Sequence, residues 1–146
     1  MYSLSSIQSL QFGVDLNQYS AMITDFLHNC GEAEKEFVSS QEWWIISGSV
    51  KVQIFLTNLE DNAELIVASN LFQYPTQKAN INEYLLKLNG TLKLKGVSFG
   101  IRNKQLILSY IRPVQGLDPE ELQWIIASIA VIADEYDDFL IEKFNI

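Results

Sequence analysis

One helix signal near the C-terminus constrains the fold more than any other feature of the chain. Residues 117–140 read LDPEELQWIIASIAVIADEYDDFL. Asp118 is a good capping residue, Pro119 suits the first helical turn, and Glu121 follows three positions after the cap. Apolar residues then recur at helical spacing, and this principal stripe comprises Leu122, Ile125, Ile129, Ile132, Tyr136 and Leu140, with Ile126, Ala133 and Phe144 alongside. We therefore predict a long helix from about Pro119 to Lys143 that covers one face of a sheet.

The same helix carries a second apolar strip. The segment from Trp124 to Ala133 contains no charged residue, and Trp124, Ala127 and Val131 lie away from the middle of the principal stripe. A helix that is apolar on most sides is usually buried on most sides. We therefore predict that these three residues contact a second copy of the chain. The alternative is that the N-terminal helix or residues 1–15 lie over them.

Acidic residues crowd the second half of this helix, at Asp134, Glu135, Asp137 and Asp138. They gain nothing from the helix dipole there, because acids are favoured at the N-terminal end. A metal site is one interpretation, but consecutive carboxylates on a helix point in different directions, and the spacing of an EF-hand is absent. We therefore predict a solvated face, with neither a metal ion nor a cofactor.

Alternating residues predict strands in the centre of the chain. After a turn at residues 47–49, apolar residues at 50, 52, 54 and 56 alternate with a mixed set at 51, 53, 55 and 57. The segment EKEFVSSQEWWIIS before the turn is rich in aromatic and β-branched residues, and LIVASNLFQY forms the next strand. Further on, VSFGIRNKQLILSYIRP predicts two strands around a tight turn at residues 102–104.

Two shorter helices complete the pattern. Helical spacing links Tyr19, Met22, Ile23, Phe26, Leu27 and Cys30, and Gly31 is a suitable C-terminal cap. Residues 76–89 return to that spacing and end at Asn89-Gly90. The predicted order is α-β-β-β-α-β-β-α, an α+β fold with an antiparallel sheet of about five strands. Residues 1–146 form one domain, with 1–15 as an N-terminal arm or short helix.

Charge and composition limit the classes of partner that the chain can bind and the cellular compartment in which we expect it. The chain has 146 residues, of which 48% are hydrophobic and 19% charged, as is typical of a globular domain. Its net charge of −8 disfavours phosphate backbones and anionic membranes, so we expect neither nucleic acid nor membrane as a partner. The longest uncharged apolar run is too short for a bilayer, which needs roughly 20 residues. A single cysteine and the lack of a visible secretory signal favour the cytoplasm.

Two stretches and the element order carry a resemblance to a known fold. EWWIISGSVKVQIFL, then LLKLNGTLKLKGVSFGIRNKQLILSYIRPVQGLDPEEL, precede the long final helix. Together they resemble the type III secretion chaperone-like fold. The likeness is strongest to its YbjN-type branch of sensory-transduction regulators and to small cyanobacterial domains of unknown function. The resemblance covers residues 17–144 and implies a non-enzymatic, often dimeric binding module.

The sequence offers little for catalysis. His28 is the only histidine, and Cys30 two residues away points about 200° round a helix, which is poor geometry for a dyad. We interpret His28 as a helix-end residue and Cys30 as a small core residue. No carboxylate pair stands out, and the glycines at 90, 96 and 100 match no phosphate-binding motif. We therefore predict no catalytic residue and no enzyme activity.

Trp43 and Trp44 are adjacent on an expected strand, so they face opposite sides of the sheet. One enters the core and the other faces out or into an interface, and the sequence does not decide which. Exposed aromatic residues are common at binding hot spots. The candidate contacts with a partner or a second copy are therefore Trp43, Trp44, Trp124, Ala127 and Val131.

Half of the ten basic residues lie between residues 87 and 104, at Lys87, Lys93, Lys95, Arg102 and Lys104. They form either a positive patch for an acidic partner or a solvated hairpin edge protected by lysines, and we favour the second interpretation.

The function predicted from these features is a homodimeric, non-enzymatic module that binds another protein, as a chaperone-like or regulatory adaptor. The alternative is a small-molecule sensor with a pocket between helix and sheet. An enzyme is the least favoured class.

Overall fold

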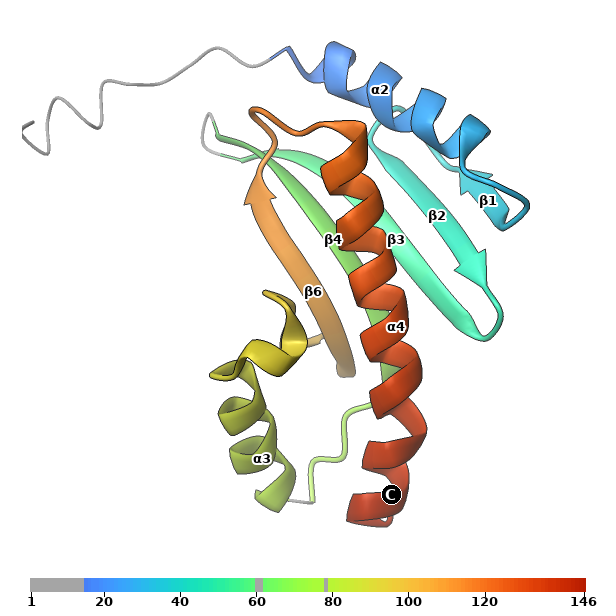
Figure 1. Ribbon diagram of the computed structural model, residues 1–146. Coiled ribbons are helices and arrows are strands. Elements are labelled where there is room, and N and C mark those ends of the chain that lie inside the picture. The colour runs from blue at the N-terminus through green and yellow to red at the C-terminus, as the bar shows by residue number, and fades with distance from the viewer. Residues whose placement is uncertain (1–14, 60–61, 78) are drawn as a thin grey trace, which may run out of the picture.

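The computed structural model describes residues 15–59, 62–77 and 79–146. In these residues, three helices cover one face of a six-stranded antiparallel sheet (Figure 1). Neighbouring strands follow the order β1-β2-β3-β4-β6-β5. The helices are α2 (Leu16–Asn29), α3 (Ala79–Asn89) and α4 (Pro119–Phe144), with a short 3-10 helix, η1 (Leu92–Leu94). The strands are β1 (Glu34–Phe37), β2 (Glu42–Ser47), β3 (Val50–Leu59), β4 (Asn62–Gln73), β5 (Ser98–Arg102) and β6 (Gln105–Pro113).

The α+β fold and the order of the predicted elements are confirmed, with one strand more than expected. The extra strand is β1, because the segment that precedes β2 turns back on itself at residues 38–41. The backbone N–H groups of Val38 and Ser39 both donate to the Glu42 carbonyl, at 3.1 and 3.2 Å. The Ser39 hydroxyl accepts from the Gln41 N–H at 3.1 Å. Ser-Ser-Gln is thus a turn inside an apparently continuous strand signal. The predicted N-terminal arm at 1–15 lies almost wholly outside the described residues.

Tight turns set the register of the hairpins. Gly48 has a φ of 61° in the β2–β3 turn, and Asn103 and Lys104 have φ values of 51° and 63° in the β5–β6 turn. Two consecutive residues with positive φ suit the right-handed twist of a two-residue hairpin. This backbone is uncommon for lysine, so the hairpin rather than its own preference holds Lys104 there.

Helix α4 forms the centre of the helical layer. The Asp118 carboxylate accepts a hydrogen bond from the Glu121 N–H at 2.8 Å, which confirms the predicted cap. The Glu121 carboxylate pairs with Arg112, which ties the start of the helix to β6. The whole principal stripe from Leu122 to Leu140 is buried, and α4 contacts β3, β4 and β6. The predicted role of this helix, covering a sheet face, is confirmed.

Helices α2 and α3 cover the two ends of the same face. Ile23 and Leu27 of α2 are fully buried, and the Tyr19 hydroxyl accepts from the Gly116 N–H at 3.0 Å. On α3, Ile81, Leu85 and Leu88 are buried in the same core. Tyr84 of α3 meets Phe144 of α4 edge-on, with 5.6 Å between ring centroids. The helices therefore form one continuous layer.

A side chain closes the free edge of β5. The Asn89 side chain donates to the Phe99 carbonyl at 3.1 Å and accepts from the Phe99 N–H at 2.8 Å. The Val97 N–H donates to the Leu94 carbonyl at 2.8 Å. Unpaired groups on an edge strand invite pairing with another chain. Asn89 and η1 therefore satisfy the edge groups that a partner strand would use at these residues.

Candidate functional site

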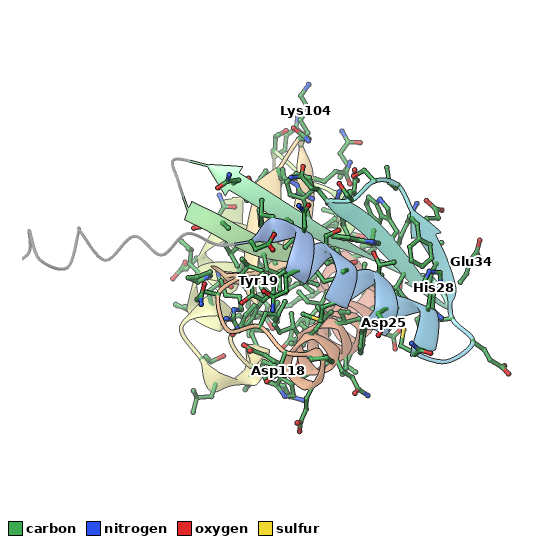
Figure 2. The ribbon with its side chains drawn as sticks, turned by 90° about the horizontal axis from the view of Figure 1, so that it is seen from above. Tyr19, Asp25, His28, Glu34, Lys104 and Asp118 are labelled. Atoms are coloured by element: carbon green, nitrogen blue, oxygen red, sulfur yellow. The ribbon has the colours of Figure 1, made fainter. Side chains whose placement is uncertain are left out.

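The sheet face opposite the helices carries apolar side chains. Figure 2 shows Lys104 on the far side of the sheet from Asp118, which lies in the helical layer. On that far side, which we call the open face, Phe55 pairs with Ile66 and Ile66 pairs with Ile111 across β3, β4 and β6. These three residues form an apolar row. Phe55 and Ile66 are half-buried and Ile111 is 58% exposed, so the row remains accessible to a partner.

The two tryptophans of β2 separate as predicted, and the structure decides which one is buried. Trp43 is 1% exposed, and its indole N–H donates to the Thr24 hydroxyl of α2 at 3.2 Å. Trp43 is thus a core residue and drops out of the candidate interface set. Trp44 is half-buried on the open face, and its indole N–H donates to Glu42 at 3.2 Å. The Lys51 ammonium group lies 4.5 Å from the centre of the Trp44 ring.

A pocket of about 400 Å³ opens on the same face, and we call it the polar pocket. Its aromatic wall is Trp44 and Phe55, and its polar lining is Gln53, Asn70, Arg102, Asn103 and Gln105. The Arg102 guanidinium donates to the Gln53 side-chain oxygen at 3.1 Å, and the Gln53 amide nitrogen donates to Glu42 at 2.8 Å. A polar network thus joins β2, β3 and β5 above the sheet.

A second hollow, of about 340 Å³, lies between α3 and the β5–β6 edge. Its lining is mainly apolar, with Leu85, Leu86, Phe99, Ile101 and Leu106, and we call it the apolar hollow. Leu86 is 71% exposed and Ile101 57% exposed. The predicted alternative of a pocket between helix and sheet therefore has a physical counterpart.

The second strip of α4 is exposed. Trp124 is 48% exposed and Val131 58% exposed, and Ala127 is also exposed. The Trp124 ring meets Tyr110 of β6 edge-on at 6.3 Å. Helix α2 packs beside α4 and leaves these three residues uncovered. The N-terminal helix α2 therefore does not cover the strip. The predicted contact of the strip with a second copy of the chain stays a prediction.

The basic residues between 87 and 104 do not form one patch. Lys87 pairs with Glu83 on α3 at 2.9 Å, and Lys93 lies on η1. Arg102 and Lys104 lie at the far end of β5, where the hairpin turns to the open face (Figure 2). The predicted cluster thus splits between the two layers.

The candidates for chemistry take packing positions. The His28 ring stacks on Phe37 at 4.6 Å, beside the end of α2. Cys30 is half-buried against the core, and its thiol approaches the Leu27 carbonyl at 3.5 Å. Burial, with smaller contributions from Glu135 and Tyr84, raises the pKa of Tyr136 above its usual 10.0.

Residues 15–59, 62–77 and 79–146 contain no cluster of three or more histidine, cysteine or acidic side chains that could hold a metal ion. None of the helices in these ranges combines the length and the apolar character that crossing a membrane requires.

Sequence reasoning missed most of the open face. The alternation at residues 51–57 marked one side as mixed, but it did not show that Phe55, Ile66 and Ile111 line up across three strands. The hydrogen bond between Arg102 and Gln53 joins residues 49 positions apart, so no local pattern predicts it. From the sequence, Trp44 was named as a candidate contact, and Arg102 and Lys104 were named only as part of a larger basic cluster.

The chain matches the model of a known protein family. The model of a family described as "T3SS (YopN, CesT) and YbjN peptide-binding chaperone 1" matches residues 17–145. No curated protein matches the chain significantly.

Solved structures with a similar fold come from protein complexes, one of which is described as a chaperone–effector complex. A chain in the HopA1–SchA chaperone–effector complex is 15% identical, with a TM-score of 0.63 over 86% of this chain and 98% of that one. A chain in the ExsC–ExsE complex is 13% identical, with a TM-score of 0.62 over 86% and 96%. One in the ExoU–SpcU complex of the Pseudomonas aeruginosa type III secretion system is 10% identical, with a TM-score of 0.55 over 68% and 83%. At these identities the likeness shows the fold alone.

Proposed function

Because this chain belongs to the family of type III secretion (YopN, CesT) and YbjN peptide-binding chaperones, we propose that it holds an extended segment of a partner protein on the open face of its sheet. The family is a chaperone family, so the chain is a protein-binding module and not an enzyme. The solved complexes with the same fold, which include a chaperone–effector complex, are consistent with a protein partner.

The observation that carries this proposal is the apolar row. Phe55, Ile66 and Ile111 lie side by side across three strands, and neighbouring apolar side chains that reach solvent are common at interaction sites. The covered face already holds the domain's core. At the β5 edge, the Asn89 side chain already pairs with the backbone N–H and carbonyl of Phe99, which disfavours addition of a partner strand at that residue.

Two isoleucines with matched exposure give the test. Ile111 is 58% exposed in the apolar row, and Ile101 is 57% exposed beside the apolar hollow. Random dodecamer peptides displayed on phage would be selected on the wild-type chain, and enriched peptides would be measured by fluorescence anisotropy. We expect Ile111→Glu to weaken binding at least tenfold, about 1.4 kcal/mol, and Ile101→Glu to change it little. The opposite order would move the binding site to the apolar hollow.

The proposal includes a homodimer formed through Trp124, Ala127 and Val131 of α4. Support comes from the exposure of this strip on the helix that forms the centre of the helical layer. Light scattering of the wild-type chain should give twice the chain mass of 16.7 kDa. Val131→Glu should reduce the mass to that of one chain, and Gln18→Glu, at an exposed position on α2, should not. A wild-type mass of 16.7 kDa would refute the dimer and leave peptide binding intact.

The apolar hollow favours a second candidate function, the binding of a small apolar ligand. Its volume of about 340 Å³ lies at the small end of ligand pockets, and its lining is mainly apolar. Native mass spectrometry of freshly purified protein would detect a retained ligand. Leu86→Trp, which narrows the hollow from its exposed wall, should prevent retention while peptide selection on the open face continues.

The proposed compartment is the cytoplasm. The half-buried Cys30 is a free thiol, which suits a reducing environment. Fractionation of the native cell, followed by immunodetection of the full chain, would test this placement.

A further inference from the structure

The polar pocket has features that the apolar row does not explain. It lies at the end of the sheet where the β5–β6 hairpin turns toward the open face, with Lys104 at the tip (Figure 2). Arg102 ends β5 and contributes its guanidinium to the pocket. In a chain with a net charge of −8, an arginine in the pocket and a lysine two residues further along the hairpin are a local exception.

The network of the pocket orients Arg102 for a ligand. Gln53 uses its oxygen to accept from Arg102 and its nitrogen to donate to Glu42, so both ends of the amide are fixed. Gln53 is therefore a positioning residue that holds the guanidinium above the sheet. The Glu42 oxygen that accepts from Gln53 also accepts from the Trp44 indole. This second bond fixes the aromatic wall in the same network.

Arg102 retains most of its donors for a partner. Among residues 15–59, 62–77 and 79–146, no carboxylate forms an ion pair with Arg102 or Lys104. A guanidinium has five N–H donors in a planar fork, and Gln53 takes one of them. The group that best matches the remaining fork is a carboxylate, because it can accept two parallel hydrogen bonds.

Charge complementarity selects one occupant. Arg102 lines the pocket, and Lys104 lies at the tip of the hairpin (Figure 2). Lys51 lies beside the Trp44 ring, and its charge is partly balanced by Glu36 at 3.7 Å. The acidic remainder of the chain repels an acidic peptide, so such a peptide gains most at this pocket. Beside the cations, Trp44 and Phe55 offer an apolar wall for a neighbouring side chain.

We infer that the polar pocket selects, within the bound segment, an Asp or Glu side chain next to an aromatic or aliphatic residue. The carboxylate binds the Arg102 fork, and the apolar neighbour packs on Trp44 and Phe55. This inference rests on the proposed function, since it names which segments the open face accepts. The sequence left open that five basic residues form a patch for an acidic partner. We now assign that role to Arg102 and Lys104 alone.

The test uses random dodecamers displayed on phage and selected on the full-length chain. We expect the enriched pool to contain an excess of Asp or Glu beside an aromatic or aliphatic residue. One enriched peptide is then synthesised in two forms, with its acidic residue retained or changed to the matching amide. The acidic form should bind about tenfold more tightly at low salt, as expected for a charge-assisted pair, and the ratio should fall as salt screens it.

Variants assign the preference to the pocket. Arg102→Gln should abolish the ratio between the two peptides. Arg102→Lys should keep part of the ratio, because it retains the charge but loses the fork. Lys93→Gln is the matched control, since it removes the same charge from η1, which precedes β5, and it should preserve the full ratio.

Each remaining outcome has a distinct meaning. An enriched pool of apolar peptides without excess acid would overturn the inference and leave the proposed function intact. An acid preference that survives Arg102→Gln would also overturn it, because the acid would then be recognised elsewhere. A selection with no enrichment above the bare support would refute the proposed function, and the inference with it.

Discussion

Trp43 and Trp44 are consecutive residues of the same type on the same strand, and they have opposite environments. Trp43 is enclosed between the sheet and α2, where Thr24 accepts its indole N–H. Trp44 lies on the open face beside Lys51 and the polar pocket. The difference comes from the pleat of β2 alone, which sends neighbouring side chains to opposite faces. One face of this sheet holds the domain together, and the other carries the apolar and charged groups that we propose bind a partner.

The largest effect that separates the two faces is expected from Trp43→Ala. The substitution removes a fully buried aromatic ring and leaves a cavity under α2, which should lower the free energy of unfolding by about 3–5 kcal/mol. Urea denaturation followed by circular dichroism measures this change. A loss below about 1 kcal/mol would show that Trp43 is not enclosed as described.

Trp44→Ala should show the reverse behaviour. We expect it to change the free energy of unfolding by less than about 1 kcal/mol, since the ring is half-buried, and to weaken binding of the enriched dodecamers by about 2 kcal/mol. Anisotropy titration and urea denaturation of the same preparation separate the two quantities. Trp44→Phe, which keeps a ring against the pocket, is the control and should retain most of the affinity.

If Trp44→Ala instead destabilised the fold as much as Trp43→Ala, the two faces would not differ in role. The open face would then be a second packing surface, and the proposal for peptide binding there would lose its main support.

Asn89 sharpens the comparison at the edge of the sheet. Asn89→Ala leaves the Phe99 N–H and carbonyl without their described partner, which should lower the free energy of unfolding by about 1–2 kcal/mol. Asn80→Ala, at an exposed position on the same helix, should change it by less than about 0.5 kcal/mol. Hydrogen exchange of the β5 amides, read by mass spectrometry, should speed up only in the Asn89 variant. Equal exchange in both variants would show that Asn89 does not close this edge.

The covered face was predictable from the sequence to a much greater extent than the open one. Helical and strand periodicities identified the principal stripe of α4 and the apolar side of β3. Residues buried against one continuous layer must recur at the helical or strand spacing, so they are visible in the sequence. The turn at residues 38–41 was missed, since EKEF and EWWIIS flank only a short polar interruption. The apolar row and the Arg102–Gln53 hydrogen bond depend on the register between distant strands, and that register has no local signature. The adjacent pair Trp43-Trp44 predicted that one ring faces the core and the other faces away from it. It did not predict which of the two rings is buried.

The smallest expected effect concerns Tyr136, an aromatic residue of the covered layer. Its ring lies between Phe99 at 5.6 Å and Phe139 at 5.9 Å, and burial raises the pKa of its hydroxyl above 10.0, with further contributions from Glu135 and Tyr84. The unfolded chain releases this proton first as the pH rises, so the folded state binds more protons between the two pKa values. The stabilising contribution is therefore complete below about pH 10 and is lost as the pH rises through the higher pKa of the folded protein.

Tyr136→Phe removes that titration and keeps the ring. The wild-type chain should lose stability between about pH 9 and 11 more steeply than the variant, while the two have similar pH dependence near neutrality. Urea denaturation at a series of pH values measures the difference, and comparison of the two chains cancels the titration of the other five tyrosines among the six present. Equal slopes would mean that water reaches the Tyr136 hydroxyl freely, and the covered layer would then be looser at this end of α4 than at Trp43.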